Sequence, residues 1–107
     1  MNLNLEEELY QSFPKLFAQK ELDHTKTCMC WGIECPNEWF QIIKNACINL
    51  QKICDEYGYQ IEFTQIKEKF GGLRMYFDFI NGTPDQMITE VYNTVDLAEK
   101  EVYLLQK

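Results

Sequence analysis

The sequence predicts a single α+β domain over residues 1–107, built on a two-stranded antiparallel hairpin at about residues 60–70 and 73–80. Apolar and polar residues alternate on both sides of Gly71-Gly72, and a glycine pair is typical of a two-residue hairpin turn because glycine readily adopts positive φ. Longer segments before and after the hairpin carry apolar residues at helical spacing. Because a two-stranded hairpin is only marginally stable in water, we expect these helices to cover its apolar face.

The N-terminal helix is expected at about residues 4–12, where apolar residues recur at helical spacing. Pro14 is unfavourable inside a helix, so a second turn should begin there, with Phe13 and Phe17 packed inward. Residues 19–27 are polar and show no periodicity, which predicts a surface loop.

The central helix, at about residues 37–57, has the clearest pattern in the chain. Its apolar stripe consists of Trp39, Ile43, Ala46, Leu50, Ile53 and Tyr57. Pro36 suits the first turn of this helix, and Gly58 suits its C-terminal cap. Cys47 and Cys54 lie beside the stripe, so we interpret them as unreactive thiols of the core.

A turn at the glycine pair of the hairpin places Lys69 opposite Arg74 and Lys67 opposite Tyr76. Side chains alternate between the two faces of a strand. The apolar face of this hairpin is therefore expected to consist of Ile66, Phe70, Leu73, Met75, Phe77 and Phe79.

The first strand of the hairpin contains an irregularity. Ile61 and Phe63 alternate in one phase, whereas Ile66 and Phe70 alternate in the other. Either a bulge lies near Thr64-Gln65, or the beginning of this strand is covered on both faces.

The C-terminal helix is expected at about residues 84–105. Thr83, Pro84 and Gln86 fit the N-cap, first and third positions of a capping box. The apolar stripe that follows consists of Ile88, Val91, Val95, Ala98, Val102 and Leu105.

The composition restricts the classes of function. The net charge of −7 argues against non-specific binding to nucleic acid and against an anionic membrane surface, because both depend on cationic side chains. No apolar run is long enough to cross a membrane, and the N-terminus does not have the pattern of a secretory signal. Five cysteines are an odd number, so we expect reduced thiols and a cytoplasmic location.

Four possible soft metal ligands occur close together in the pattern H-x3-C-x-C-x4-C: His24, Cys28, Cys30 and Cys35. Zinc requires four such donors in a tetrahedron, but two of them in a C-x-C pair are awkward for one tetrahedral ion. We therefore treat these residues as weak candidates and expect ordinary thiols, no metal and no other cofactor.

An enzymatic activity finds no support in the sequence. The acidic run Glu6-Glu7-Glu8 is typical of a solvated helix face. A cysteine–histidine pair would need an orienting third group, and no phosphate loop or dinucleotide-binding motif is found.

The hairpin carries the cluster of cations that stands out in this acidic chain. The candidate ligand-binding residues are Lys67, Lys69, Gly71, Gly72, Arg74 and Tyr76. Lys69 directly opposite Arg74 would be repulsive unless an anion lies nearby. Two alternatives stay open. The anion is either an internal carboxylate, from Glu68, Asp78 or a helix that reaches over, which is the commoner arrangement, or a ligand phosphate. In the second case Tyr76 would offer a flat surface for a base, and the turn would offer backbone N–H groups.

Three segments occur in a characteristic order: F-P-K-L-F at 13–17, C-W-G-I-E-C at 30–35 with Trp39 soon after, and Q-I-K-E-K-F-G-G-L-R-M-Y at 65–76. Over roughly residues 9–100 the chain resembles a family of small, mostly uncharacterised phage and prophage proteins with signatures like C-W-G-x-x-C-G-D-G-W and V-K-E-K-F-G-T-L-R-F-Y. It departs from the pattern at Pro36-Asn37-Glu38, and it has no C-x-x-C pair after the last helix. The resemblance implies an intracellular accessory role and provides no catalytic residues.

We therefore expect a non-catalytic phage-type accessory protein, a counter-defence factor that captures a phosphate-bearing, nucleotide-like signalling molecule. The alternative is an acidic protein that inhibits a host defence or replication protein by direct contact and binds no small ligand. A homodimer is also expected, because a two-stranded hairpin leaves both edges open and the short chain is rich in aromatic residues.

Overall fold

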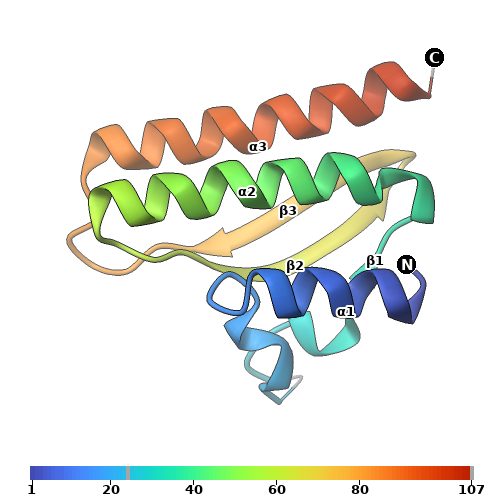
Figure 1. Ribbon diagram of the computed structural model, residues 1–107, viewed down its shortest axis with the longest axis horizontal. Coiled ribbons are helices and arrows are strands. Elements are labelled where there is room, and N and C mark those ends of the chain that lie inside the picture. The colour runs from blue at the N-terminus through green and yellow to red at the C-terminus, as the bar shows by residue number, and fades with distance from the viewer. Residues whose placement is uncertain (24, 107) are drawn as a thin grey trace.

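The computed structural model describes residues 1–23 and 25–106, and within them it has the α+β architecture that the sequence predicts. The helices are α1 (Leu3–Ser12), α2 (Phe40–Tyr57) and α3 (Asp85–Leu105), with three short 3-10 helices, η1 (Ala18–Glu21), η2 (Met29–Trp31) and η3 (Asn37–Trp39). The strands are β1 (Ile33–Glu34), β2 (Glu62–Lys69) and β3 (Gly72–Asp78). Helices α2 and α3 lie side by side across one face of the sheet, and α1 lies beside them near β2 (Figure 1).

The sheet has three strands in the order β1-β2-β3, so the prediction that it has only the two strands of the hairpin is wrong. The antiparallel pairing of the hairpin itself, β2 with β3, is present. Strand β1 runs parallel to β2 and pairs Ile33 with Ile66 and Glu34 with Lys67. Two residues are too few to show an alternating pattern, which explains why the sequence did not indicate this strand. Strand β1 covers part of the outer edge of β2, so less open edge is left for a partner chain than was expected. The homodimer stays a prediction.

Strand β1 is held in place by a buried carboxylate of α1. Glu6 is 8% exposed, and its Oε1 accepts a hydrogen bond of 2.5 Å from the Ile33 N–H. A Cβ atom at Gly32 would lie 2.6 Å from the same oxygen, so this close approach requires glycine. The N-terminal ammonium of Met1 donates to the Ile33 carbonyl at 3.0 Å. Glu6 therefore does not belong to the solvated acidic face expected from the sequence.

The hairpin turn is formed by Phe70 and Gly71 and not by the glycine pair. Both turn residues have positive φ, 55° and 79°, as a type I′ turn requires. Lys69 consequently pairs with Gly72, and Lys67 pairs with Arg74. In the observed register each of these residues pairs with a partner two positions away from the expected one. A shift of two residues keeps every strand residue on the same face of the sheet. The alternation could not exclude the wrong register for this reason.

Phe70 is the one predicted core residue of the hairpin that this register moves to the surface. It is 93% exposed at the tip of the turn. Of the two explanations for the phase change in the first strand, the bulge is confirmed. The β2–β3 register shifts between Phe63 and Gln65, which places the bulge at Thr64.

The boundaries of the long helices agree with the sequence, but the caps agree only in part. Helix α2 follows directly on η3, and Gly58 caps it in the left-handed region, with its N–H bonded to the Cys54 carbonyl at 2.8 Å. The predicted capping box before α3 does not form. Pro84 is the N-cap, and the Thr83 hydroxyl donates instead to the Ile80 carbonyl at 2.6 Å, closing the preceding turn.

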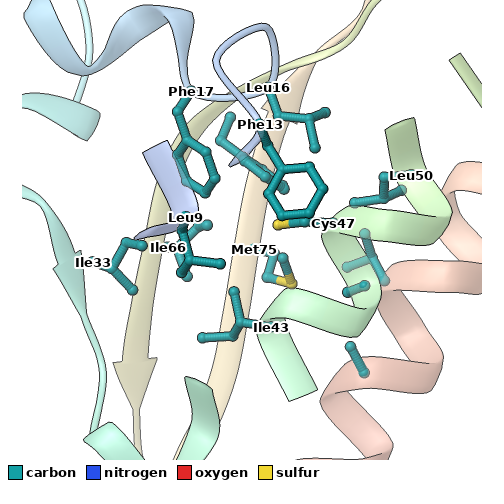
Figure 2. Close-up of a cluster of buried hydrophobic side chains, with 14 of the residues drawn as sticks. Leu9, Phe13, Leu16, Phe17, Ile33, Ile43, Cys47, Leu50, Ile66 and Met75 are labelled. Atoms are coloured by element: carbon teal, nitrogen blue, oxygen red, sulfur yellow. The ribbon is translucent and has the colours of Figure 1, made fainter. Parts of the chain in front are cut away.

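One hydrophobic core lies between the helices and the covered face of the sheet. Phe13 and Phe17 pack inward as predicted, and Cys47 and Cys54 are buried. Figure 2 shows Phe13 above the Cys47 thiol on α2, with Leu9 of α1 close to Ile66 and Ile33. Burial raises the pKa of the Cys47 and Cys54 thiols, which keeps both protonated and unreactive.

Candidate ligand-binding face

The three long helices gather on one side of the sheet, and the side chains of β2 and β3 that alternate away from them form its open face (Figure 1). The open face consists of Glu62, Gln65, Lys67, Lys69, Arg74, Tyr76 and Asp78. Gln65 lies opposite Tyr76, and Lys67 lies opposite Arg74. Like charges directly opposite each other destabilise a sheet by about 0.2–1 kcal/mol. Glu34 of β1 lies on the other side of Lys67 and offsets part of this repulsion.

A pocket of about 520 Å³ lies where the segment before η2 meets the open face. We call it the open-face pocket, and its lining residues are Thr25, Lys26, Thr27, Cys28, Thr64, Gln65, Lys67 and Tyr76. It is a shallow depression that is largely open to solvent. Half of the lining comes from β2 and β3, and half comes from a loop about forty residues earlier in the chain.

The bulge in β2 attaches this loop to the sheet. Thr64 is the extra residue of the bulge, and its carbonyl accepts hydrogen bonds from the Cys28 N–H at 3.1 Å and from the Thr27 hydroxyl at 3.2 Å. The Thr27 hydroxyl oxygen in turn accepts the Met29 N–H at 3.2 Å. Bulges commonly redirect groups beside functional sites, and here the bulge fixes one wall of the pocket.

The lining combines groups that recognise anions with a flat aromatic surface. Lys26 approaches from the loop and Lys67 from β2, and both provide ammonium donors for a phosphate. The hydroxyl of Thr25 and the amide of Gln65 add neutral hydrogen-bonding groups. Tyr76 is half exposed beside them and offers a ring on which a planar group can stack.

The structure brings together two of the six residues that the sequence singled out. Lys67 and Tyr76 line the open-face pocket, whereas the other four lie toward the hairpin tip. The Nζ atom of Lys69 lies 5.8 Å from the centre of the Phe70 ring. Arg74 donates from Nη1 to the Leu73 carbonyl at 3.0 Å.

The two glycines serve the hairpin itself. The Gly71 N–H donates to Oε2 of Glu68 at 2.5 Å, so this N–H already has an acceptor within the protein. A Cβ atom at Gly72 would lie 3.1 Å from Nη1 of Arg74, a contact that a small shift of this flexible side chain would relieve.

The carboxylates considered as internal partners for the cations have other partners. Glu68 binds the turn N–H, and Asp78 accepts a hydrogen bond of 3.3 Å from the Gln19 amide, which also donates to Glu62 at 3.2 Å. Gln19 is buried, so the segment 19–27, which was expected to be a surface loop, is not exposed at its first residue. The open face is therefore acidic at its base and basic toward its tip.

Arg74 lies near a helix carboxylate, which is one of the internal partners expected from the sequence. Burial raises the pKa of Glu99 on α3, while a hydrogen bond to the Met75 backbone and the nearby Arg74 guanidinium oppose this rise. Arg74 therefore interacts electrostatically with a carboxylate of α3 as well as lying opposite Lys67.

Sequence reasoning missed the loop half of the pocket: Thr25, Lys26, Thr27 and Cys28, together with Thr64 of the bulge. The phase change near Thr64 was the available signal, because a bulge often marks a site. It did not say which distant segment would lie against it.

The candidate metal ligands are spread over different environments. Cys28 is exposed, Cys30 donates to the Thr27 carbonyl at 3.6 Å, and Cys35 is buried, where burial raises its pKa to about 12. His24 lies outside the described residues. Within residues 1–23 and 25–106, no three His, Cys, Asp or Glu side chains come together in a way that could hold a metal ion.

No family model matches the chain, and neither a curated protein nor a solved structure matches it. The resemblance to phage proteins thus stays an expectation. A search of the described helices finds none with the length and apolar character needed to cross a membrane.

Proposed function

We propose that the protein is a non-catalytic binding protein whose open-face pocket holds a phosphate-bearing small molecule with a planar ring, such as a nucleotide. The observation that carries the proposal is the pocket itself, which joins Lys26 and Lys67 to Tyr76 in a chain of net charge −7.

The charge distribution favours an anion at this place. An acidic chain repels anions overall, so an anion site needs a local group of cations. Lys67 faces Arg74 across the strands, and Lys26 is added from the loop. A bound phosphate would offset the repulsion within this group, and each charge-assisted hydrogen bond would contribute about 1.5–3 kcal/mol.

The biological role follows from the resemblance and from the chemistry of the lining. Capturing a signalling nucleotide requires affinity and stoichiometric amounts of protein, and it requires no reaction. Lysine, threonine, glutamine and tyrosine side chains provide such affinity. We therefore propose a counter-defence factor that removes a nucleotide-like host signal.

A second candidate is an acidic protein that occupies a basic surface of a host defence or replication protein. The net charge of −7 favours it, because opposite charge accelerates and orients the encounter between two proteins. In this case the open-face pocket would have no small ligand.

The decisive experiment begins with protein purified under native conditions and examined by mass spectrometry for a non-covalent ligand and by ultraviolet absorbance for a nucleobase. Calorimetric titration with a panel of linear and cyclic ribonucleotides follows. We expect a saturable complex with at least one of them, and we expect Lys67→Gln to weaken it roughly tenfold to a hundredfold.

Lys100→Gln is the matched control, since it removes the same charge from an exposed position on α3. It should leave the affinity nearly unchanged. If no nucleotide binds, or if both variants weaken binding equally, the open-face pocket is not the site and the second candidate is preferred.

A further inference from the structure

The tip of the hairpin has a conformation that its residue does not favour. Phe70 has φ of 55° and is 93% exposed. This position of a type I′ turn favours asparagine, aspartate or glycine, because a bulky side chain is strained at positive φ. Strain together with near-complete exposure of a large apolar ring has no benefit for the fold of one chain, and it suggests a role in contact with a partner.

The tip is also held firmly. Glu68 binds the Gly71 N–H at 2.5 Å from within the hairpin. In the amide orientation that satisfies both neighbours, Gln106 after α3 donates to the Gly71 carbonyl at 2.7 Å and accepts the Trp39 indole N–H at 3.2 Å. The Phe70 ring is thus presented on a fixed turn, which lowers the entropy lost when it docks.

A pocket that suits this ring lies elsewhere on the same chain. It has a volume of about 450 Å³, and we call it the α1–α2 pocket. Its lining residues are Ser12, Phe13, Ile48, Gln51, Lys52, Asp55 and Glu56. Its apolar lining comes mainly from Ile48, which is 47% exposed, with a smaller part from Phe13, which is 9% exposed. Asp55 and Glu56 outnumber Lys52, so the lining has a net negative charge that complements Lys69 beside Phe70.

A chain cannot fill its own α1–α2 pocket with its own tip. The tip is attached beside Trp39 at the beginning of α2, whereas the pocket follows the second half of that helix. Helical rise places Phe40 and Lys52 roughly 18 Å apart. Figure 1 shows the hairpin turn beside the N-terminal end of α2 and the C-terminal end of α3.

We propose that two copies of this chain associate by inserting Phe70 of each into the α1–α2 pocket of the other, with Lys69 beside Asp55 and Glu56. A two-fold axis makes the contact twice and closes the pair, whereas a single contact would leave a tip and a pocket free for open chains. This inference uses neither the open-face pocket nor its ligand.

Sedimentation equilibrium over a wide concentration range tests the proposal. The wild-type chain should reach a mass of two chains, and Phe70→Asn should remain at one. Asparagine tolerates positive φ, so this variant should melt at or above the temperature of the wild type. Ile48→Glu changes the wall of the pocket at a half-exposed position and should also give single chains.

Mixing the two variants distinguishes this contact from others. Phe70→Asn keeps an intact pocket and Ile48→Glu keeps an intact tip, so a mixed pair has one of the two contacts and should form at higher concentration than the wild-type pair. Leu3→Gln is the control, because Leu3 is 82% exposed on α1 and lies outside both contact regions. It should leave the pair intact.

Several results would overturn the proposal: a wild-type chain that stays single at millimolar concentration, a pair that persists in Phe70→Asn or in Ile48→Glu, a mixture that forms no pair, or a Leu3→Gln variant that dissociates equally. If Phe70→Asn fails to fold, Lys69→Glu replaces it and should weaken the pair by charge reversal. Nucleotide affinity measured in single-chain Ile48→Glu should equal that of the wild type, so this test and the test of the open-face pocket fail independently.

Discussion

The two faces of the β2–β3 sheet are built from the same strands and have opposite properties. On the covered face, Phe63, Ile66, Leu73 and Met75 are almost fully buried under the helices. On the open face, the side chains that alternate with them are Gln65, Lys67, Arg74 and Tyr76, all of them partly exposed. The covered face stabilises the fold, while the open face combines repelling cations with an aromatic ring. Stability and the proposed binding should therefore respond to different substitutions, although the residues concerned are neighbours in sequence.

The largest expected effect is on the covered face. Leu73→Ala removes a fully buried side chain and should lower the free energy of unfolding by about 2–5 kcal/mol, because a cavity remains in the core. Urea unfolding followed by circular dichroism measures this loss. The folded fraction should still bind ligand with wild-type affinity. A loss below roughly 1 kcal/mol would contradict the assignment of the covered face as the main source of stability.

The next effect concerns the sheet edge, where the two faces meet. Glu6→Ala leaves the buried N–H of Ile33 without its acceptor and should cost about 1–3 kcal/mol. Glu6→Gln keeps an acceptor oxygen at the same place and should cost less. Hydrogen exchange of the Ile33 amide, measured in both variants, checks this order. Equal exchange rates in wild type and Glu6→Ala would show that Glu6 does not hold β1.

On the open face we expect substitutions to change the free energy of unfolding little and the ligand affinity strongly. Lys67→Gln removes a repulsion from Arg74 and an attraction to Glu34, so the free energy of unfolding should change by less than about 1 kcal/mol. The same substitution should weaken the ligand complex. Thermal melting and calorimetry on one sample give both values. A lower melting temperature with unchanged affinity would show that Lys67 is structural and would remove the difference between the faces.

The smallest effect lies where α3 contacts β3. Burial raises the pKa of Glu99 above that of the unfolded chain, so the folded state binds this proton more tightly. The contribution of Glu99 to stability therefore increases as pH falls through the folded pKa toward the unfolded one, and it is unfavourable at neutral pH. Glu99→Gln should slightly raise the free energy of unfolding at neutral pH, and this gain should vanish in acid. Urea midpoints across pH test the sign, and a gain that grows in acid would contradict it.

The covered face could be predicted from sequence because alternation determines which residues lie inside. The register could not, since a shift of two residues keeps Ile66 and Leu73 on the same face. Phe70 was assigned to the core because the turn was expected at Gly71-Gly72, which placed Phe70 on the strand in the apolar phase. The open-face pocket was predicted only on its strand side, at Lys67 and Tyr76. Its loop side depends on a contact between Cys28 and Thr64, and no local pattern encodes a contact at that separation.

The central claim is that the open face binds a phosphate-bearing ligand in the pocket between the loop and the sheet. Backbone amide chemical shifts, recorded by NMR during titration with the ribonucleotide that binds best, test this claim most directly. We expect saturable changes concentrated at residues 25–28 and 64–67 and at Tyr76, with the covered-face residues Leu73 and Met75 little affected. Saturable changes located instead along α2, or no saturable change with any nucleotide of the panel, would contradict it.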